Sequence, residues 1–222
     1  MKAAHAYAHL LRLRKPVVTT AEAAARWRAT RSAASRVLGR LAAAGLVRPL
    51  RRGLWSLLRD TDPLMLPEYL TAPFPAYVSF QSALHLHGMI SQIPSVIYVA
   101  SLAPTRTIET TVGTYSVHRL SPEFFGGYEV RESGIQLARP EKALLDVLYL
   151  ANTRSRLFAR LPELELPPRF NVRGARRWIA RISSPYRRTM VTRRLNAILN
   201  VSAPSAKSLR LSRGKKVADA AR

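Results

Sequence analysis

The sequence predicts an α+β protein, on three observations. Apolar residues recur at helical spacing through the first 60 residues, short β-branched runs follow between residues 96 and 138, and helical spacing returns after residue 139. A proline-rich stretch from residue 63 to 75 coincides with a change in the sign of the charge and marks a boundary. We therefore expect a domain over residues 1–60, a mixed α+β domain over residues 61–201 and a basic disordered tail over residues 202–222.

The charge is uneven along the chain. The 222 residues carry a formal net charge of +23, and 30 of the 36 basic residues are arginine. Because GC-rich genomes also produce an arginine bias beside abundant alanine, the total says little about a partner. The distribution says more, since residues 1–60 carry +11, residues 61–150 carry −3 and residues 151–222 carry +15. Two basic ends around a slightly acidic middle predict two separate basic surfaces.

The first 28 residues predict two helices with a short strand between them. Apolar spacing indicates a helix over residues 3–11, which Lys15-Pro16 ends. Val17-Val18 is a short strand. A second helix follows over residues 21–27, where a threonine before Glu22 supplies the cap and the glutamate lies in the first turn.

A third helix is expected over residues 31–44, capped by Thr30 and ended by Gly45. Its apolar stripe consists of Ala34, Val37, Leu38 and Leu41. The other side is small, polar and cationic, with Arg31, Ser32, Ser35, Arg36, Gly39 and Arg40. Small residues let a helix enter a major groove about 12 Å wide, and arginines can contact base edges and phosphates.

A β-hairpin is expected next, with strands over residues 46–50 and 54–57 and a turn of Arg51, Arg52 and Gly53. The order helix, strand, helix, helix, basic hairpin is typical of a winged helix-turn-helix that binds duplex DNA. The candidate DNA-binding residues in this domain are Thr30, Arg31, Ser32, Ser35, Arg36, Arg40, Arg51 and Arg52.

The middle of the chain predicts strands around two helices. A helix over residues 81–88 has Ser79 as its N-cap, and a second helix with Pro140 in its first turn runs to Leu150 as part of the core. Strands are expected over residues 96–99, 107–112 and 114–120, with a further one over residues 130–138.

Two basic helices are expected at residues 172–182 and 185–199. We expect an inward side of Trp178, Ile179, Ile182, Tyr186, Met190, Val191, Leu195, Ile198 and Leu199, with arginines facing out. On charge alone, Arg173, Arg176 and Arg177 are further candidate DNA contacts.

The sequence predicts no enzyme, metal or cofactor. Glu141 and Asp146 do not converge on one face of their helix, and His85 and His87 point to different faces of theirs. Ser79, Ser82 and His118 lack a Gly-x-Ser-x-Gly turn, and no glycine-rich phosphate loop occurs. The absence of cysteine, of a secretory signal and of a membrane-spanning run leads us to expect a cytoplasmic, nucleoid-associated protein.

Several segments together resemble the AbiEi family of antitoxins. They are residues 77–88, Gln92-Ile93-Pro94, residues 97–99 and residues 138–146, with Thr19-Thr20 and residues 52–55 in the first domain. The resemblance covers about residues 1–150. It implies the antitoxin of a type IV toxin-antitoxin system for abortive infection, which represses its own operon through the winged helix and has a nucleotidyltransferase-like toxin as its functional partner.

The resemblance further implies that the second domain carries the antitoxic activity and assists cooperative DNA binding. Two other classes stay open from the residues. One is a non-specific DNA- or RNA-binding or nucleoid-associated protein without a toxin partner, and the other is an enzyme that cleaves phosphodiesters. Sequence preference at about 150 mM salt separates the first from a specific repressor, because purely electrostatic binding is weak there.

Overall fold

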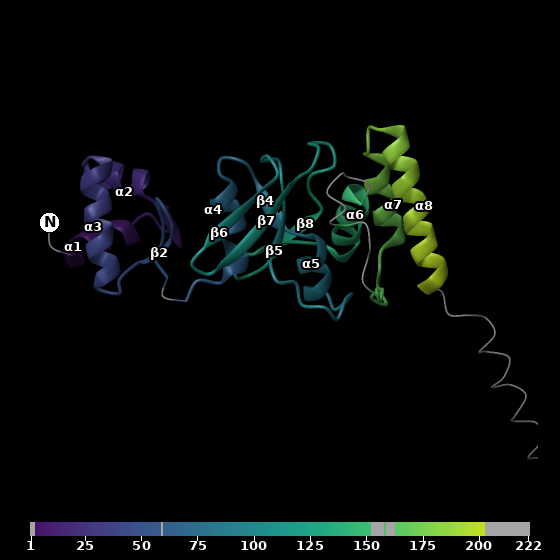
Figure 1. Cartoon of the computed structure of the whole chain (residues 1–222), viewed down its shortest axis with the longest axis horizontal. Helices are drawn as coiled ribbons and strands as arrows, with labels where there is room; N and C mark the ends of the chain where they lie inside the picture. The colour runs from purple at the N-terminus through teal and green to yellow at the C-terminus, as the bar shows by residue number, and fades with distance from the viewer. Residues whose placement is uncertain (1–2, 59, 152–157, 159–162, 203–222) are drawn as a thin grey trace, which may run out of the picture.

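The computed structural model describes residues 3–58, 60–151, 158 and 163–202, and its fold is α+β as predicted. Figure 1 shows an elongated molecule, with the N-terminal helices at one end, a twisted sheet in the middle and the C-terminal helices at the other end. The expected tail lies outside the described residues, apart from Ser202, which is the last residue of the final helix.

The N-terminal part contains three helices and a three-stranded antiparallel sheet. In chain order the elements are α1 (Ala3–Leu11), β1 (Val17–Thr19), α2 (Thr20–Trp27), α3 (Arg31–Ala43), β2 (Arg48–Arg51) and β3 (Leu54–Ser56). The strands lie in the order β1-β3-β2. Every element predicted here is present, with bounds that differ by at most two residues.

A small hydrophobic core holds these helices together. It draws on all three helices, on Val18 of β1 and on residues that flank β2 and β3: Ala6, Leu10, Val18, Ala23, Leu38, Leu41, Val47 and Leu57. Helix α3 contributes Leu38 and Leu41, which have no exposed surface, as has Ala34 on the same stripe. Because α3 uses only this stripe for packing, its opposite side is left to the solvent.

The central sheet is mixed and has six strands. Its elements are β4 (Ala76–Val78), β5 (Ile97–Ser101), β6 (Arg106–Thr110), β7 (Gly113–Arg119), β8 (Tyr128–Val130) and β9 (Gln136–Ala138), in the order β6-β7-β5-β4-β9-β8. The 3-10 turn η1 (Pro63–Met65) and helix α4 (Pro67–Thr71) precede it. The prediction of one strand over residues 130–138 is wrong. This stretch is a hairpin, because Gly134 at φ +80° lets the chain turn back between β8 and β9.

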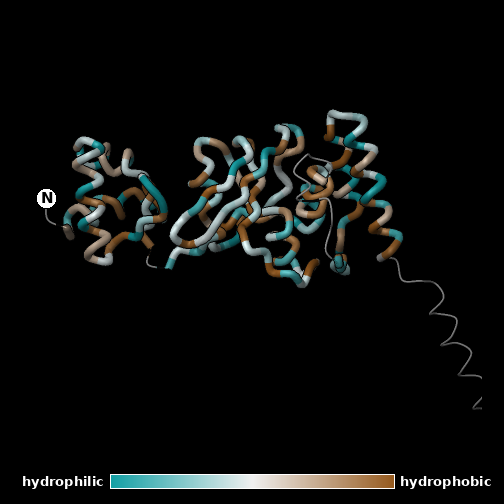
Figure 2. The backbone as a smooth tube through the Cα atoms, viewed as in Figure 1, coloured by the Kyte–Doolittle hydropathy of each residue, from teal (hydrophilic) through white to brown (hydrophobic). Residues whose placement is uncertain are grey.

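Four helices cover the sheet and extend the molecule. Helix α5 (Phe80–Leu86) packs on β5, α6 (Pro140–Leu150) packs on α5, and α7 (Val172–Ala180) and α8 (Pro185–Ser202) pack on α6. Every residue of α6 from Lys142 to Leu150 is buried, which confirms its core role. In Figure 2, hydrophilic and hydrophobic stretches alternate along α7 and α8. The inward orientation predicted for Tyr186 is wrong, since it lies in the first turn of α8 and is 72% exposed.

The N-terminal part and the central sheet share a hydrophobic cluster. Val17, Leu50 and Leu54 from the small sheet pack with residues of the central part, namely Leu66, Leu70, Ala76, Val99, Ile108, Tyr115 and Val117. The β6–β7 turn also bonds to strand β2, because Thr111 donates its N–H to the Leu50 carbonyl (2.9 Å) and its hydroxyl to the Pro49 carbonyl (2.7 Å). The hairpin of β2 and β3 is therefore fixed against the central sheet.

His118 on β7 makes stability depend on pH. Burial among Phe80, Tyr98 and Phe158 lowers the pKa of His118 from 6.5 to about 4. The unfolded chain therefore binds the extra proton first, and stability that is fully present above pH 6.5 is lost as the pH falls towards 4. We expect a free energy of unfolding about 2 kcal/mol lower at pH 5 than at pH 7 from this group.

Urea unfolding at the two pH values measures the effect, with His118→Phe as the matched aromatic control. The pH 7 to pH 5 difference should shrink in the variant by about the same 2 kcal/mol. An unchanged difference would mean that His118 does not carry the pH dependence.

Candidate nucleic-acid interface

Helices α2 and α3 are joined by a tight turn. Helix α2 begins with a capping box, in which the Thr19 hydroxyl accepts from the Glu22 N–H (3.1 Å) and the Glu22 carboxylate accepts from the Thr19 N–H (2.8 Å). It ends at Arg28, whose φ of +51° reverses the chain where a glycine would be more usual. Two residues later the Thr30 hydroxyl accepts from the Ala33 N–H (3.2 Å) and starts α3. This confirms Thr30 as the cap.

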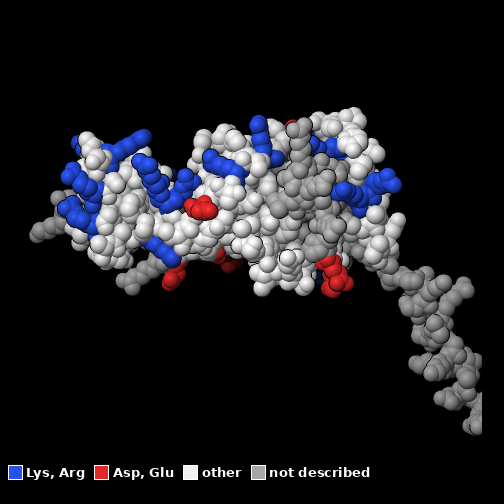
Figure 3. All heavy atoms as spheres, viewed as in Figure 1, with Lys and Arg blue, Asp and Glu red and all other residues white. Residues whose placement is uncertain are grey.

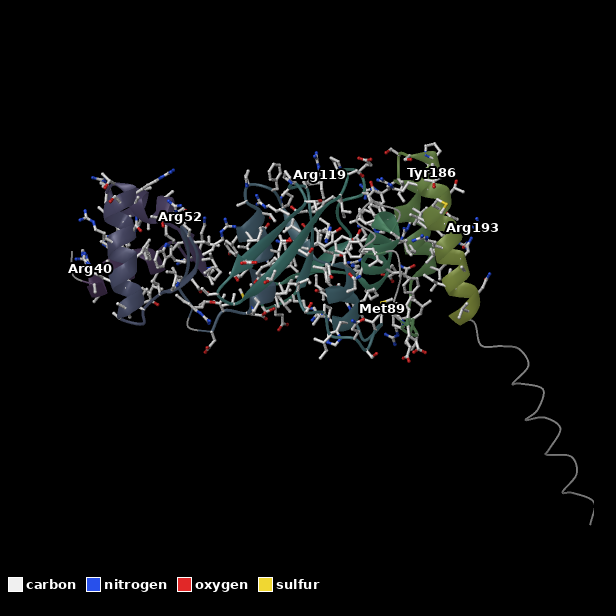
Figure 4. The ribbon with its side chains drawn as sticks, viewed as in Figure 1. Arg40, Arg52, Met89, Arg119, Tyr186 and Arg193 are labelled. Carbon is white, nitrogen blue, oxygen red and sulfur yellow. The ribbon has the colours of Figure 1, made fainter. Side chains whose placement is uncertain are left out.

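The outer side of α3 carries arginines around small residues. The predicted contacts on α3, namely Arg31, Ser32, Ser35, Arg36 and Arg40, are all exposed. At 100° per residue, Arg36 lies nearly opposite the buried stripe of Ala34, Leu38 and Leu41. Figure 4 shows Arg40 at the outer end of the molecule. The neighbours of Arg36 one turn before and one turn after it on this side are Ser32 and Gly39. Because both are small, the major groove of DNA can approach the helix backbone there.

No acidic residue of α3 neutralises the arginines on its outer side. Helix α3 contains no Asp or Glu, and the nearby Glu22 pairs with Lys15 (2.7 Å). Burial alone would raise the pKa of Glu22, but hydrogen bonds from Lys15 and Thr19 outweigh it and hold that pKa below its usual value. In Figure 3, blue side chains gather over the N-terminal end of the molecule. This end of the molecule therefore presents basic side chains on the face shown.

The hairpin has a two-residue tip. The prediction placed both Arg51 and Arg52 at the tip, but Arg51 is the last residue of β2 and pairs with Leu54. Arg52 and Gly53 form the turn, with Gly53 at φ +81°. Both arginines are exposed. In Figure 4, Arg40 projects from α3 at the outer end of the molecule, and Arg52 lies on the inner side of that helix.

The start of α2 holds this hairpin in place. Thr20 donates its N–H to the Gly53 carbonyl (2.9 Å), and its hydroxyl accepts from the indole N–H of Trp55 (2.9 Å). Together with the bonds from Thr111, these contacts tie the hairpin on two sides. The hairpin is therefore held in one position relative to helix α2 and to the central sheet before any ligand binds.

The candidate arginines of α7 do not share one surface. All three are exposed, but Arg176 lines a groove against α8 and Arg177 lines a cavity against α6. Their directions differ by about 100° around the axis, since they are adjacent in the helix. Arg173 lies one turn before Arg177. The structure thus separates residues that the sequence analysis grouped on charge alone.

A buried polar cluster escaped the sequence analysis. Asp146 of α6, with no exposed surface, forms an ion pair with Lys142 and accepts from the hydroxyls of Ser79 (2.6 Å) and Tyr77 (3.1 Å). Lys142 also donates to the Tyr77 hydroxyl (3.0 Å) and lies 4.1 Å from the centre of the Phe124 ring. Ser79 is the N-cap residue of α5 as predicted, but its hydroxyl makes no capping bond because it donates to Asp146 instead.

Burial controls the titration of this cluster. It raises the pKa of Asp146, against the opposing effect of Lys142 and the two hydroxyls, and it raises the pKa of Tyr77 well above 10. Burial also lowers the pKa of Lys142, while the Asp146 charge raises it. One signal could have revealed the pair, since Lys142 and Asp146 are four residues apart and are the only charged residues of α6 after Glu141.

The other candidates for chemistry have separate partners. The His87 ring nitrogen Nε2 lies 2.7 Å from the Ala138 carbonyl, His118 contacts the Ser116 hydroxyl (2.9 Å), and Ser82 accepts from the Tyr98 N–H (2.9 Å). Glu141 accepts from the Asn171 N–H (2.8 Å) and does not converge with Asp146. Among the described residues no group of His, Asp and Glu is arranged to hold a metal ion.

No protein-family model matches the chain, and no curated protein matches it significantly. Within the described part of the chain, no helix is both long enough and apolar enough to span a bilayer.

Proposed function

We propose that the protein is a sequence-specific DNA-binding transcription regulator whose N-terminal part acts as a winged helix-turn-helix. The observation that carries this proposal is the outer side of α3, where Arg36 and Arg40 stand among small residues on a helix without acids. Such a helix fits the major groove, and its arginines match the acceptor edge of guanine.

The neighbouring elements support the same proposal. Helices α2 and α3 are joined by three residues, 28–30, as in helix-turn-helix proteins, where the second helix is the reading helix. The hairpin of β2 and β3 follows α3 directly and presents Arg52 at its tip. In this role the hairpin is the wing, and Arg51 and Arg52 contact the DNA backbone or the minor groove.

The biological role we propose is autorepression by the antitoxin of a type IV toxin-antitoxin system. This step rests on the resemblance of residues 1–150 to AbiEi antitoxins, and it assigns the protein no catalytic step. Co-expression with a nucleotidyltransferase-like toxin from a neighbouring gene tests it, with colony growth as the readout. Growth rescue supports the antitoxin role, and continued toxicity despite expression of both proteins contradicts it.

Operator preference is the expected result for the DNA-binding proposal. An electrophoretic shift assay at about 150 mM salt should show the region upstream of the gene bound in excess competitor DNA, because specific binding is typically ~10³-fold or more tighter than non-specific binding. In the same assay Arg36→Ala should cost about 1–3 kcal/mol on the operator. Arg173→Ala removes the same charge from α7 and should leave the operator preference unchanged.

Equal binding of the upstream region and a random duplex would contradict the proposal and favour a non-specific nucleic-acid-binding protein. A loss in Arg36→Ala that is the same on both sequences would make Arg36 a phosphate contact rather than a base contact. Breakdown of labelled DNA or RNA in the presence of Mg²⁺ or Mn²⁺ would contradict the absence of a catalytic step.

A further inference from the structure

A cavity of about 270 Å³ lies between α6 and α7, away from α3. Its walls come from the start of α6, the start of α7 and the outward side of α7: Arg139, Glu141, Lys142, Asn171, Gly174, Arg177, Trp178 and Arg181. Ligand pockets for drug-sized molecules are ~300–1,000 Å³, so this cavity suits a smaller molecule. A DNA duplex is far too wide to enter it.

Cations dominate the cavity wall. Arg139, Arg177 and Arg181 line it, and the ammonium of Lys142 lies behind them. Glu141 is the one carboxylate among the lining residues, and it already accepts the Asn171 N–H. Within the described residues, the one ion pair of Arg139 is a long contact with Glu129 (3.9 Å), in which both side chains are about half exposed or more. Such a surface pair contributes little stability, so Arg139 can turn to another anion.

Arg177 and Arg181 repel each other, and Arg181 also repels the buried Lys142. Arg177 and Arg181 are four residues apart on α7, where like charges are destabilising. The Arg181 charge also lowers the pKa of Lys142, in addition to the larger effect of burial. An anion in the cavity would offset this repulsion, because it attracts Lys142 and the three arginines at once.

The wall is rigid at its base. Gly126 and Gly127, both at positive φ, lie against the Trp178 ring, and a Cβ on Gly127 would be 2.9 Å from the ring and 2.9 Å from Lys142 Cγ. The guanidinium of Arg181 stacks on the same indole, 4.5 Å from the ring centre. This packing fixes Trp178 and one of the three arginines before any ligand arrives, which lowers the entropic cost of binding.

We propose that this cavity binds a small phosphate-bearing anion no larger than a mononucleotide, with Arg139, Arg177 and Arg181 as its contacts. Guanidinium groups are the preferred partners of phosphate oxygens, because their N–H donors match two oxygens at once. The inference is independent of the DNA-binding proposal, since it concerns a different ligand at a different part of the molecule. It also gives Arg177 a role distinct from that of Arg176.

Isothermal titration of the full chain with inorganic phosphate, with AMP and with neutral adenosine tests the proposal at about 150 mM NaCl. We expect saturable one-to-one binding of AMP, of phosphate or of both, and none of adenosine. Arg177→Gln and Arg181→Gln should each weaken binding about tenfold or more, because each removes a charge-assisted contact. Arg176→Gln, the same change one residue away in the groove with α8, should have less than about a twofold effect.

A fourth variant acts in the opposite direction. Glu141→Gln keeps an acceptor for the Asn171 N–H but removes the negative charge, so it should tighten anion binding. Thermal unfolding of each variant without ligand separates a loss of fold from a loss of binding, since all three arginines are exposed. Operator binding should be unchanged in Arg181→Gln, which distinguishes failure here from failure of the DNA-binding proposal.

Three outcomes would overturn the inference. They are binding of adenosine as strong as that of AMP, no saturable binding of either anion, and an equal loss in Arg176→Gln and Arg177→Gln. The last would indicate general attraction to a basic surface. Displacement of the anion by a random duplex, together with weaker duplex binding by Arg177→Gln, would instead assign these arginines to nucleic-acid contact.

Discussion

Replacing Asp146 with alanine is expected to lower the free energy of unfolding by about 3–5 kcal/mol, the usual cost of removing one partner of a buried ion pair. Asp146 has no exposed surface and Lys142 is only 1% exposed, so water cannot replace the lost partner. The substitution leaves the Lys142 ammonium buried without its counter-charge. It also leaves the hydroxyls of Ser79 and Tyr77 without the acceptor that they share. Urea unfolding monitored by circular dichroism measures the change.

The double variant Lys142→Met and Asp146→Leu is the matched control. It removes both charges and keeps apolar volume, so it should destabilise the protein less than Asp146→Ala alone. If Asp146→Ala costs less than about 1 kcal/mol, Asp146 does not stabilise the fold through its buried contacts with Lys142, Tyr77 and Ser79. If the double variant costs as much as Lys142→Met and Asp146→Leu, each measured alone, add up to, the loss comes from packing rather than from charge.

Local signals account for the parts of the fold that were predicted well. Thr30 and Gly45 bound α3, the Thr19 and Glu22 pair starts α2, and Pro140 opens α6. Each of these acts within a few residues of its own position, through a cap, a positive φ or a fixed φ, so each can be inferred from a short window of sequence. The exposed side of α3 follows from the same periodicity.

Contacts between distant residues account for most of what was missed. Ser79 lies 67 residues before Asp146, and its hydroxyl donates to that carboxylate instead of capping helix α5, which begins at the next residue. A residue pattern cannot show which of two acceptors or donors a serine will meet across the fold. The same holds for Thr111, which fixes the hairpin from 62 residues away. The exposure of Tyr186 depends on whether another part of the fold packs against the first turn of α8, and a sequence pattern does not show this.

The arginines of the carboxyl end illustrate a different limit. Composition predicted a basic region correctly, but it cannot show which way each arginine points. Arg176 lines the groove between α7 and α8, whereas Arg177 lines the cavity between α6 and α7. In contrast, α3 has a single packing side, so its arginines were placed by the position of its leucines. Sequence therefore located the candidate reading helix well and the second basic surface only in outline.

Replacing the three arginines of α3 together should remove operator binding. The variant Arg31→Gln, Arg36→Gln, Arg40→Gln is expected to weaken operator affinity by about 100-fold or more, since bidentate contacts to bases contribute about 1–3 kcal/mol each. The slope of log affinity against log salt should fall by about one for each lost phosphate contact. Fluorescence anisotropy with a short labelled operator, repeated over a series of salt concentrations, measures both quantities.

An equal loss of charge at the other end of the molecule provides the control. The variant Arg173→Gln, Arg176→Gln, Arg193→Gln also removes three charges, and Figure 4 shows Arg193 and Arg40 at opposite ends of the molecule. If overall charge governed binding, the two triple variants would lose the same affinity on every duplex. If α3 reads the sequence, only the first loses the operator preference. Any effect of the second should then appear on long DNA alone, because a short duplex bound at α3 does not extend along the whole protein.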